Sequence, residues 1–267
     1  MTEPIALDDA VDRIALTDQL LIALDFDGTL SETVDNPEDA RALPLARSAV
    51  LDLLELADTR IAVVSGRALD SLERVSQFPS SVALVGSHGS EFRVDGLESS
   101  HELDDSQRSL LGLVYRALTE VAGEFDGVRI EQKPSGCGLH TRLCTRKDAA
   151  AAHAVALRVV GELDGENQVS SRYGKDILEF TLHTADKGTA LSRLREQLGA
   201  SAVVFVGDDV TDEDGFRALR QGDLSVKVGE GDTAADFRVV NPDAVALFLA
   251  QLFRARRDEV ESRSSRM

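Results

Sequence analysis

Two aspartates that follow a strongly apolar segment are the first residues whose types and spacing could carry chemistry. The run Leu20–Leu24 ends abruptly in the polar segment 25–29, which reads DFDGT. Five apolar residues bounded by a turn signal predict a strand buried on both faces. Gly28 allows a sharp turn, so Asp25 and Asp27 should leave the strand end close together, where two desolvated carboxylates need a cation or a shared proton. For this segment alone, an Asx-turn that caps a helix is the alternative interpretation.

Three other segments place polar side chains at the end of a predicted buried strand or at the start of a helix. Ser65 follows the apolar segment 61–64, and Lys187 opens a helical segment. Asp208 and Asp209 follow the most apolar segment of the chain, 202–206. Because ligands of open α/β sheets bind outside the carboxyl ends of the strands, we expect these groups to converge on one site.

Together these residue types suit phosphoryl transfer through a carboxylate. Asp25 can attack phosphorus and form an aspartyl phosphate, which splits one difficult step into two. Mg²⁺ would lie between Asp25, Asp208 and a phosphate oxygen, since it prefers a few carboxylates together with substrate phosphate. Lys187 would add a point charge, and the Ser65 hydroxyl would hold a phosphate oxygen. Asp27 would protonate the leaving oxygen and then deprotonate the attacking water.

Composition limits the classes of partner. The 267 residues suit one large or two modest domains, and 43% apolar content is ample for a core. A net charge of −18 opposes binding to nucleic acid or to an anionic membrane. Cys137 and Cys144 form neither a disulfide framework nor a zinc pattern. The first 16 residues do not form a signal peptide, and no apolar run approaches the ~20 residues of a membrane span, so we expect a cytoplasmic protein.

Buried strands and amphipathic helices alternate in the two outer parts of the chain. Expected strands cover 20–25, 61–64, 82–85, 202–206, 224–228 and 237–240, and expected helices cover 5–19, 44–57, 67–77, 187–198 and 242–253. This order is typical of a parallel sheet with crossover helices. We therefore expect one α/β domain made of residues 1–91 and 185–267, followed at its end by a frayed charged tail.

The middle of the chain, residues 92–184, has a different pattern. Polar and apolar residues alternate over 128–131 and 138–143, with a turn signal at Pro134-Ser135-Gly136 between them. Helical spacing covers 104–122 and 147–162. The alternation indicates an antiparallel sheet solvated on one face. We expect a separate small α+β domain inserted into the sheet domain.

These residues carry a resemblance to the haloacid dehalogenase superfamily of phosphatases and, more narrowly, to trehalose-6-phosphate phosphatases. Its marks are DFDGTL at 25–30, SGR at 65–67, HG at 88–89, ExK at 131–133, HxR at 140–142, LEF at 178–180, DKG at 186–188 and GDDVTDEDGF at 207–216. The resemblance extends from about residue 20 to residue 252, and the last of these motifs is its most specific part.

The resemblance implies a Rossmann-like core with an inserted cap that closes over a sugar. It implies a Mg²⁺ site made of Asp25, the main-chain carbonyl of Asp27, and Asp208, with Asp209 and Asp212 supporting the metal. The residues expected to contact the substrate are Arg67, His88, Glu131, Lys133, His140, Arg142 and Glu179. A solvated strand face is the alternative for Glu131 and Lys133, and structural hydrogen bonding is the alternative for the two histidines.

The implied activity is Mg²⁺-dependent hydrolysis of trehalose 6-phosphate. Another sugar phosphate, such as sucrose 6-phosphate or glucosylglycerol phosphate, is the alternative substrate. A catalytically silent sensor is disfavoured because Asp25, Asp27, Lys187 and Asp208 are all present. The sequence holds no synthase domain, so a trehalose-phosphate synthase is expected as a pathway partner only.

Overall fold

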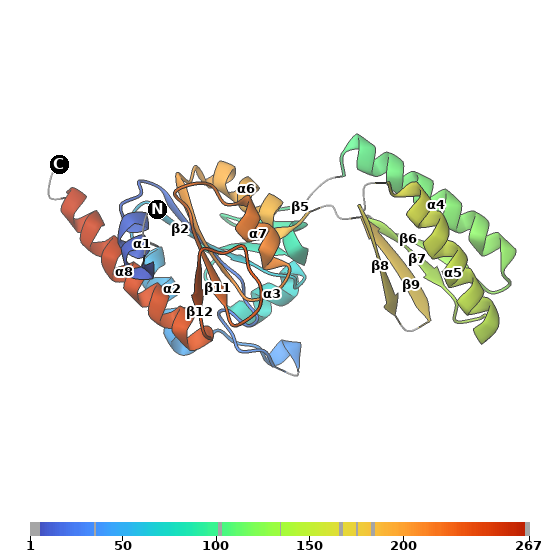
Figure 1. Cartoon of the computed structure of the whole chain (residues 1–267), viewed down its shortest axis with the longest axis horizontal. Coiled ribbons are helices and arrows are strands. Elements are labelled where there is room, and N and C mark those ends of the chain that lie inside the picture. The colour runs from blue at the N-terminus through green and yellow to red at the C-terminus, as the bar shows by residue number, and fades with distance from the viewer. Residues whose placement is uncertain are drawn as a thin grey trace. The chain divides into compact units, whose positions relative to one another are not determined.

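The computed structural model of the chain describes residues 6–34, 36–100, 103–133, 135–165, 168–174, 176–182 and 185–264. The chain forms two compact units (Figure 1). The larger consists of Met1–Ser100 with Ala185–Met267, and the smaller consists of His101–Thr184. Among the described residues, no helix is both long and apolar enough to cross a membrane.

The larger unit is built on a sheet whose described strands follow the order β12-β11-β10-β1-β2-β3-β4-β5. The strands are β1 (Leu20–Leu24), β2 (Thr59–Val64), β3 (Ala83–Gly86), β4 (Glu91–Val94), β5 (Leu97–Ser100), β10 (Ala202–Gly207), β11 (Leu224–Val228) and β12 (Phe237–Val239). Pairing is parallel from β12 to β3 and antiparallel in the β4–β5 hairpin. The chain passes from β1 to β2 on one side and returns at β10 on the other, so the strand order switches at β1. The predicted parallel sheet is confirmed.

Helices cover both faces of this sheet (Figure 1). They are α1 (Leu7–Ala15), α2 (Pro44–Leu54), α3 (Leu69–Ser76), α6 (Lys187–Leu198), α7 (Asp212–Ala218) and α8 (Pro242–Ser264), with short 3₁₀ turns η1 (Pro37–Asp39) and η2 (Ser87–Gly89). Alternate side chains of β1 point to opposite faces. Leu20, Ile22 and Leu24 pack with residues of α1, α2, α3 and α8, whereas Leu21 and Ala23 pack with residues of α6 and α7. Every residue of β1 is therefore buried.

The smaller unit is an antiparallel sheet with two helices on one face. Its strands are β6 (Arg129–Lys133), β7 (Gly136–His140), β8 (Val169–Gly174) and β9 (Ile177–Leu182), in the order β6-β7-β9-β8, and its helices are α4 (Asp105–Glu124) and α5 (Arg146–Leu163). Leu139 and Phe180 pack against Leu118 of α4 and Ala156 of α5. The other face carries polar side chains, as the alternation predicts. Pro134 of the predicted turn lies outside the described residues.

Two boundaries differ from the sequence expectation. The smaller unit begins at His101 rather than at residue 92, because β4 pairs with β3 and buries Phe92 and Val94 in the core of the larger unit. The alternating pattern of this edge hairpin resembles that of the inserted sheet. In addition, α8 continues to Ser264, so the segment expected to fray is helical as far as that residue.

Candidate active site

The turn after β1 brings two acidic segments into contact. Gly28 has φ +80°, a left-handed conformation that favours glycine, and its N–H donates to the Ser31 carbonyl at 2.8 Å. A Cβ on Gly28 would lie 2.1 Å from Oδ2 of Asp208. The missing side chain therefore lets the Asp208 carboxylate approach the turn that carries Asp25 and Asp27.

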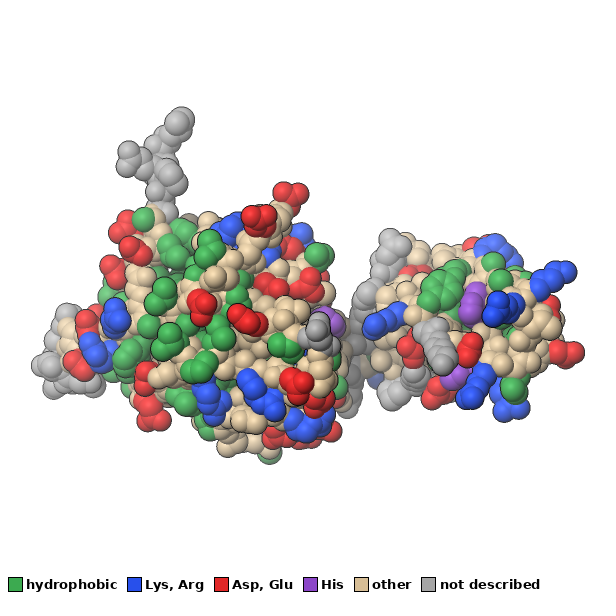
Figure 2. All heavy atoms as spheres, turned by 90° about the horizontal axis from the view of Figure 1, so that it is seen from below, with side chains coloured by type: hydrophobic (Ala, Val, Ile, Leu, Met, Phe, Trp, Pro, Cys, Tyr) green, Lys and Arg blue, Asp and Glu red, His purple; other side chains and the backbone are tan. Residues whose placement is uncertain are grey.

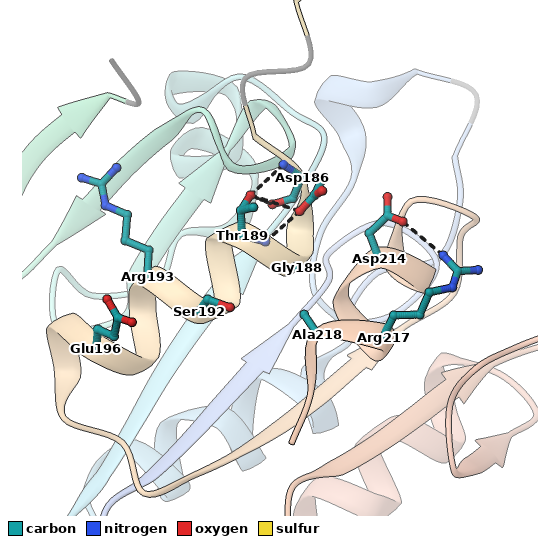
Figure 3. A pocket seen from close by; sticks show the side chains of 9 residues that line it. All are labelled: Asp186, Gly188, Thr189, Ser192, Arg193, Glu196, Asp214, Arg217 and Ala218. Carbon is teal, nitrogen blue, oxygen red and sulfur yellow. Dashed lines mark hydrogen bonds and ion pairs between the residues drawn. The ribbon is translucent and has the colours of Figure 1, made fainter. Parts of the chain in front are cut away.

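Lys187 connects this turn to the start of α7. It is the first residue of α6, and Asp186 fixes that start by accepting a hydrogen bond from the Thr189 N–H at 2.7 Å (Figure 3). The Nζ atom of Lys187, which is 2% exposed, donates to Oδ1 of Asp25 at 2.6 Å. It also donates to Oδ1 of the fully buried Asp212 at 2.6 Å. One ammonium group thus bridges two buried carboxylates.

This cluster holds more negative charge than one lysine balances. Burial raises the pKa of Asp25 to about 8, although Lys187 acts in the opposite direction. Burial also raises the pKa of Asp208, and the neighbouring Asp212 adds to that effect. For Lys187 itself, Asp25 and Asp212 outweigh burial, and the pKa is raised. The raised pKa values of Asp25 and Asp208 mean that these carboxylates are stabilised by an added cation or by a proton.

The residues suited to hold such a cation are Asp25, Asp208 and Asp212. Each offers one carboxylate oxygen, and these atoms lie within 4.8 Å of one another. An all-oxygen set of carboxylates matches the preference of Mg²⁺. Asp209, which was expected among the metal residues, is not in this group, and its Oδ1 accepts from the Val210 N–H at 2.7 Å. Asp212, which the family resemblance gave only as a support for the metal, is the third carboxylate of the group.

Asp27 is two residues after Asp25 in sequence, but its ion-pair partner is Arg67 rather than Lys187. Arg67 donates from Nε to Oδ2 of Asp27 and from Nη2 to Oδ1, both at 2.6 Å. These bonds raise the pKa of Arg67 above its ordinary value. Nη1 of Arg67 donates to the Pro37 carbonyl at 2.8 Å. Arg67, expected to bind substrate, therefore contacts the expected acid–base residue.

The segments predicted to converge line one cavity of about 480 Å³, together with a few neighbouring residues. Its lining includes Asp25, Asp27, Ser65, Arg67, His88, Lys187 and Asp209. Ser65 is buried. His88 has φ 56°, and its ring lies so close to Gly66 that a Cβ there would be 2.5 Å from Cε1. Gly66, which lacks a side chain, leaves the room that the His88 ring occupies.

The polar face of the smaller unit carries three of the expected substrate residues. Glu131 and Glu179 flank Gly138 on neighbouring strands in the pairing register. Nε2 of His140 lies 2.9 Å from Oε2 of Glu131. Lys133 lies on β6 opposite Gly136, whereas Arg142 lies beyond the end of β7 and is exposed.

Lys227 is a further residue of the site, and the sequence patterns described above do not single it out. Its side chain is buried in β11, and Nζ donates to the main-chain carbonyl of Asp208 and, at 2.7 Å, to that of Val228. Lys227 therefore holds the loop that presents the Asp208 carboxylate. The sequence feature that could have indicated Lys227 is a lysine within the predicted buried strand 224–228.

Acidic and basic side chains are interspersed on the face shown in Figure 2. This distribution gives that face no continuous basic surface of the kind that nucleic acid requires, in keeping with the net charge of −18.

Comparisons with known proteins agree with this geometry. Residues 23–242 match the sequence model of the trehalose-phosphatase family. Relatives named trehalose-phosphate phosphatase from Mycobacterium leprae and Mycobacterium avium are 31% identical over 93% of this chain and 34% identical over 86% of it. The chain spans about three-fifths of the length of these relatives, 62% and 61%.

A solved structure of trehalose-6-phosphate phosphatase from Aspergillus fumigatus is similar to this chain with a TM-score of 0.69 and 22% identity, covering 96% of this chain and 100% of that one. This likeness shows that the two chains share a fold. The match of the family model to most of the sequence shows the relationship itself: the chain belongs to the trehalose-phosphatase family.

Proposed function

We propose that this protein hydrolyses trehalose 6-phosphate to trehalose and phosphate, with Mg²⁺ as cofactor and an aspartyl phosphate as intermediate. The observation that carries the proposal is the contact of Lys187 with Asp25 and Asp212, next to Asp208, beside a cavity lined by Asp25, Lys187 and Ser65. The names of the relatives support the sugar, and the cluster supports the chemistry.

In the first half of the reaction, Asp25 attacks phosphorus and the bond to the sugar oxygen breaks. Asp27 gives a proton to that leaving oxygen. Lys187 orients Asp25, and the Ser65 hydroxyl lies on the cavity wall, where it can hold a phosphate oxygen. Asp25, Asp208 and Asp212, with the main-chain carbonyl of Asp27, would hold Mg²⁺, which when bound neutralises the charge that otherwise separates an anionic nucleophile from a phosphate.

In the second half, water attacks the phosphorus of the aspartyl phosphate on Asp25. Asp27 now accepts a proton from that water, and the carboxylate of Asp25 is released together with phosphate. The same side chain can serve both halves because it was left deprotonated by the first. Positioning and charge neutralisation carry most of the rate enhancement in such reactions.

The polar face of the smaller unit supplies suitable groups for sugar hydroxyls. Glu131 and Glu179 can accept hydrogen bonds, His140 can donate or accept, and Lys133 is a donor. Gly138 leaves space between the two glutamates. A site made of such groups rejects analogues that leave them unpaired.

A phosphate-release assay with matched substrates tests the proposal. The panel is trehalose 6-phosphate, sucrose 6-phosphate, glucosylglycerol phosphate and glucose 6-phosphate, each with Mg²⁺ and with EDTA. We expect rapid release from trehalose 6-phosphate, its loss in EDTA, and no release by Asp25→Asn. Acid quenching of a reaction on ³²P-labelled substrate should leave label on the wild type and none on Asp25→Asn. Preference for another sugar, or turnover in EDTA, would contradict the proposal.

A further inference from the structure

We propose that Arg67 is a positioning residue that acts through Asp27 and does not bind the phosphate of the substrate. The inference rests on the proposed function, because it takes the acid–base role of Asp27 from it. The question is whether the guanidinium of Arg67 binds Asp27 or the phosphate, and the hydrogen bonds of Arg67 answer it.

The first step is the geometry of the pair. Nε and Nη2 of Arg67 donate to the two different oxygens of Asp27, each at 2.6 Å. Two parallel hydrogen bonds fix the plane of a carboxylate as well as its distance, which a single bond does not. Both oxygens of Asp27 are engaged, so the side chain cannot turn without breaking at least one bond.

The second step is that Arg67 is itself held in place. Its Nη1 donates to the Pro37 carbonyl at 2.8 Å, and the guanidinium carbon lies 5.9 Å from the centre of the Phe26 ring. The main chain is fixed too, since the Arg67 N–H donates to Oγ of Ser65 at 3.2 Å and the Arg67 carbonyl accepts from the Ser87 N–H at 2.7 Å. The side chain is only 11% exposed. All three nitrogens of the guanidinium therefore have acceptors within the protein.

The third step is the demand that the reaction makes on Asp27. Its carboxyl group must meet the leaving oxygen in one half of the reaction and the attacking water in the other. A displacement of about 1 Å in such a group costs on the order of 10² in rate. The fork of Arg67, anchored to Pro37 and to the segment after β2, supplies the required placement, whereas Lys187 and Ser65 are cavity-lining groups that can meet the phosphate.

A double-mutant cycle tests the inference on the whole 267-residue chain with Mg²⁺. The variants are Arg67→Ala, Asp27→Asn and the two combined, assayed with trehalose 6-phosphate and with phenyl phosphate. Because Arg67 acts through Asp27, Arg67→Ala should lower kcat by on the order of 10² with KM changed by less than about threefold. The combined variant should be no slower than Asp27→Asn by more than about threefold.

Additive losses in the cycle, or a loss of Arg67→Ala that lies mainly in KM, would overturn the inference. Arg74→Ala is the matched control, because Arg74 pairs with Glu38 at an exposed site on neighbouring α3 and should leave kcat and KM unchanged. If wild-type protein turns over phenyl phosphate and not trehalose 6-phosphate, the proposed function fails while the cycle on phenyl phosphate still decides the role of Arg67.

Rescue gives a second readout that a purely structural role would not move. Guanidinium ion at millimolar concentration should restore part of the rate of Arg67→Ala and none of the rate of Asp27→Asn. Arg67→Lys keeps the charge but cannot form two parallel bonds, so it should remain slow even if Arg67→Ala is too unstable to assay. Full activity of Arg67→Lys would show that charge alone suffices and would refute the positioning role.

Discussion

Nζ of Lys187 lies 2.6 Å from Oδ1 of Asp25 and 2.6 Å from Oδ1 of Asp212. The ammonium group, at the start of α6, joins the end of β1 to the start of α7. Three segments that are distant in sequence therefore meet at one buried positive charge. The arrangement has consequences for stability, for metal binding and for pH dependence that can be measured separately.

Removing the bridging ammonium should destabilise the protein and stop catalysis. In Lys187→Met the buried Asp25 and Asp212 lose their cation, and above the raised pKa of Asp25, where both are ionised, breaking a buried pair in this way costs about 3–5 kcal/mol. We expect that loss in urea unfolding measured in EDTA, and a fall in phosphate release of at least ~10²-fold with Mg²⁺. Lys147→Met, at an exposed position of α5, is the control. Equal stability of the two variants would contradict the bridge.

The two adjacent acidic residues after β10 should differ in their effect on metal binding. Asp208 belongs to the carboxylate cluster and Asp209 does not. Asp208→Asn should therefore raise the Mg²⁺ concentration for half-maximal activity by more than the ~10-fold typical of supporting residues, and Asp209→Asn should change it by less than that. Calorimetric titration with Mg²⁺ should rank the variants in the same order. The reverse order would place the metal elsewhere.

Metal-free protein should lose stability as the pH rises from about 4 to about 8. Burial raises the pKa of Asp25 to about 8, whereas an unfolded aspartate titrates near 4. The folded state therefore binds the extra proton in this window, and the free energy of unfolding falls with rising pH. The raised pKa of Lys187 acts only above the ordinary lysine range and leaves this sign unchanged.

The measurement is the difference in unfolding free energy between wild type and Asp25→Asn, taken in EDTA at intervals from pH 4 to pH 9. This difference isolates the contribution of Asp25 from that of other groups. It should decline through the window in EDTA and become flatter with Mg²⁺, which favours the ionised carboxylate. A difference that grows with pH in EDTA would be inconsistent with a raised pKa.

Arg256 should matter for stability and not for turnover. It is fully buried on α8 and donates to the carbonyls of Ala15, Thr17, Asp18 and Asp58 and to the Thr59 hydroxyl. Arg256→Met leaves these acceptors unpaired, and we expect a loss of at least about 3 kcal/mol in unfolding free energy. Kinetic constants of the folded fraction should stay unchanged. The neighbouring exposed Arg257 provides the control, since Arg257→Met should be close to neutral.

Gly138 should influence the choice of substrate. A Cβ there would lie 3.6 Å from Oε2 of Glu131 and 3.6 Å from Nε2 of His140, on the polar face of the smaller sheet. Its tightest contact, 2.9 Å, is with the end of the Ile177 side chain, which can move. We expect Gly138→Ala to raise KM for trehalose 6-phosphate about tenfold while turnover of phenyl phosphate persists. An equal loss on both substrates would indicate a folding defect instead.

The sequence predicts those elements whose pattern of apolar residues fits only one type of secondary structure. β1 and β10 are continuous apolar runs that end in aspartates, and both the strands and their convergence follow from that pattern. The inserted sheet follows from alternation. In these cases the local preference and the tertiary environment agree, so the residues alone suffice.

What the sequence leaves open depends on tertiary contacts. The fork between Arg67 and Asp27 spans 40 positions, and nothing local distinguishes it from an arginine that binds phosphate. Lysine is usually found at the surface. Lys227 is buried, and two main-chain carbonyls accept hydrogen bonds from its Nζ. The later part of α8 is held by Arg256, which donates to the carbonyls of Ala15 and Asp58, both far away in sequence.

The position of β1 between β2 and β10 has a consequence for synthesis of the protein. A ribosome releases Asp25 early, but the strand that completes its surroundings emerges only after the whole inserted unit has been made. Until then the nascent chain has neither Lys187 nor Asp208, and β1 has one open edge. Asp25 thus gains Lys187 and Asp208 only after the inserted unit has been synthesised, and until then one edge of a hydrophobic strand is open to aggregation.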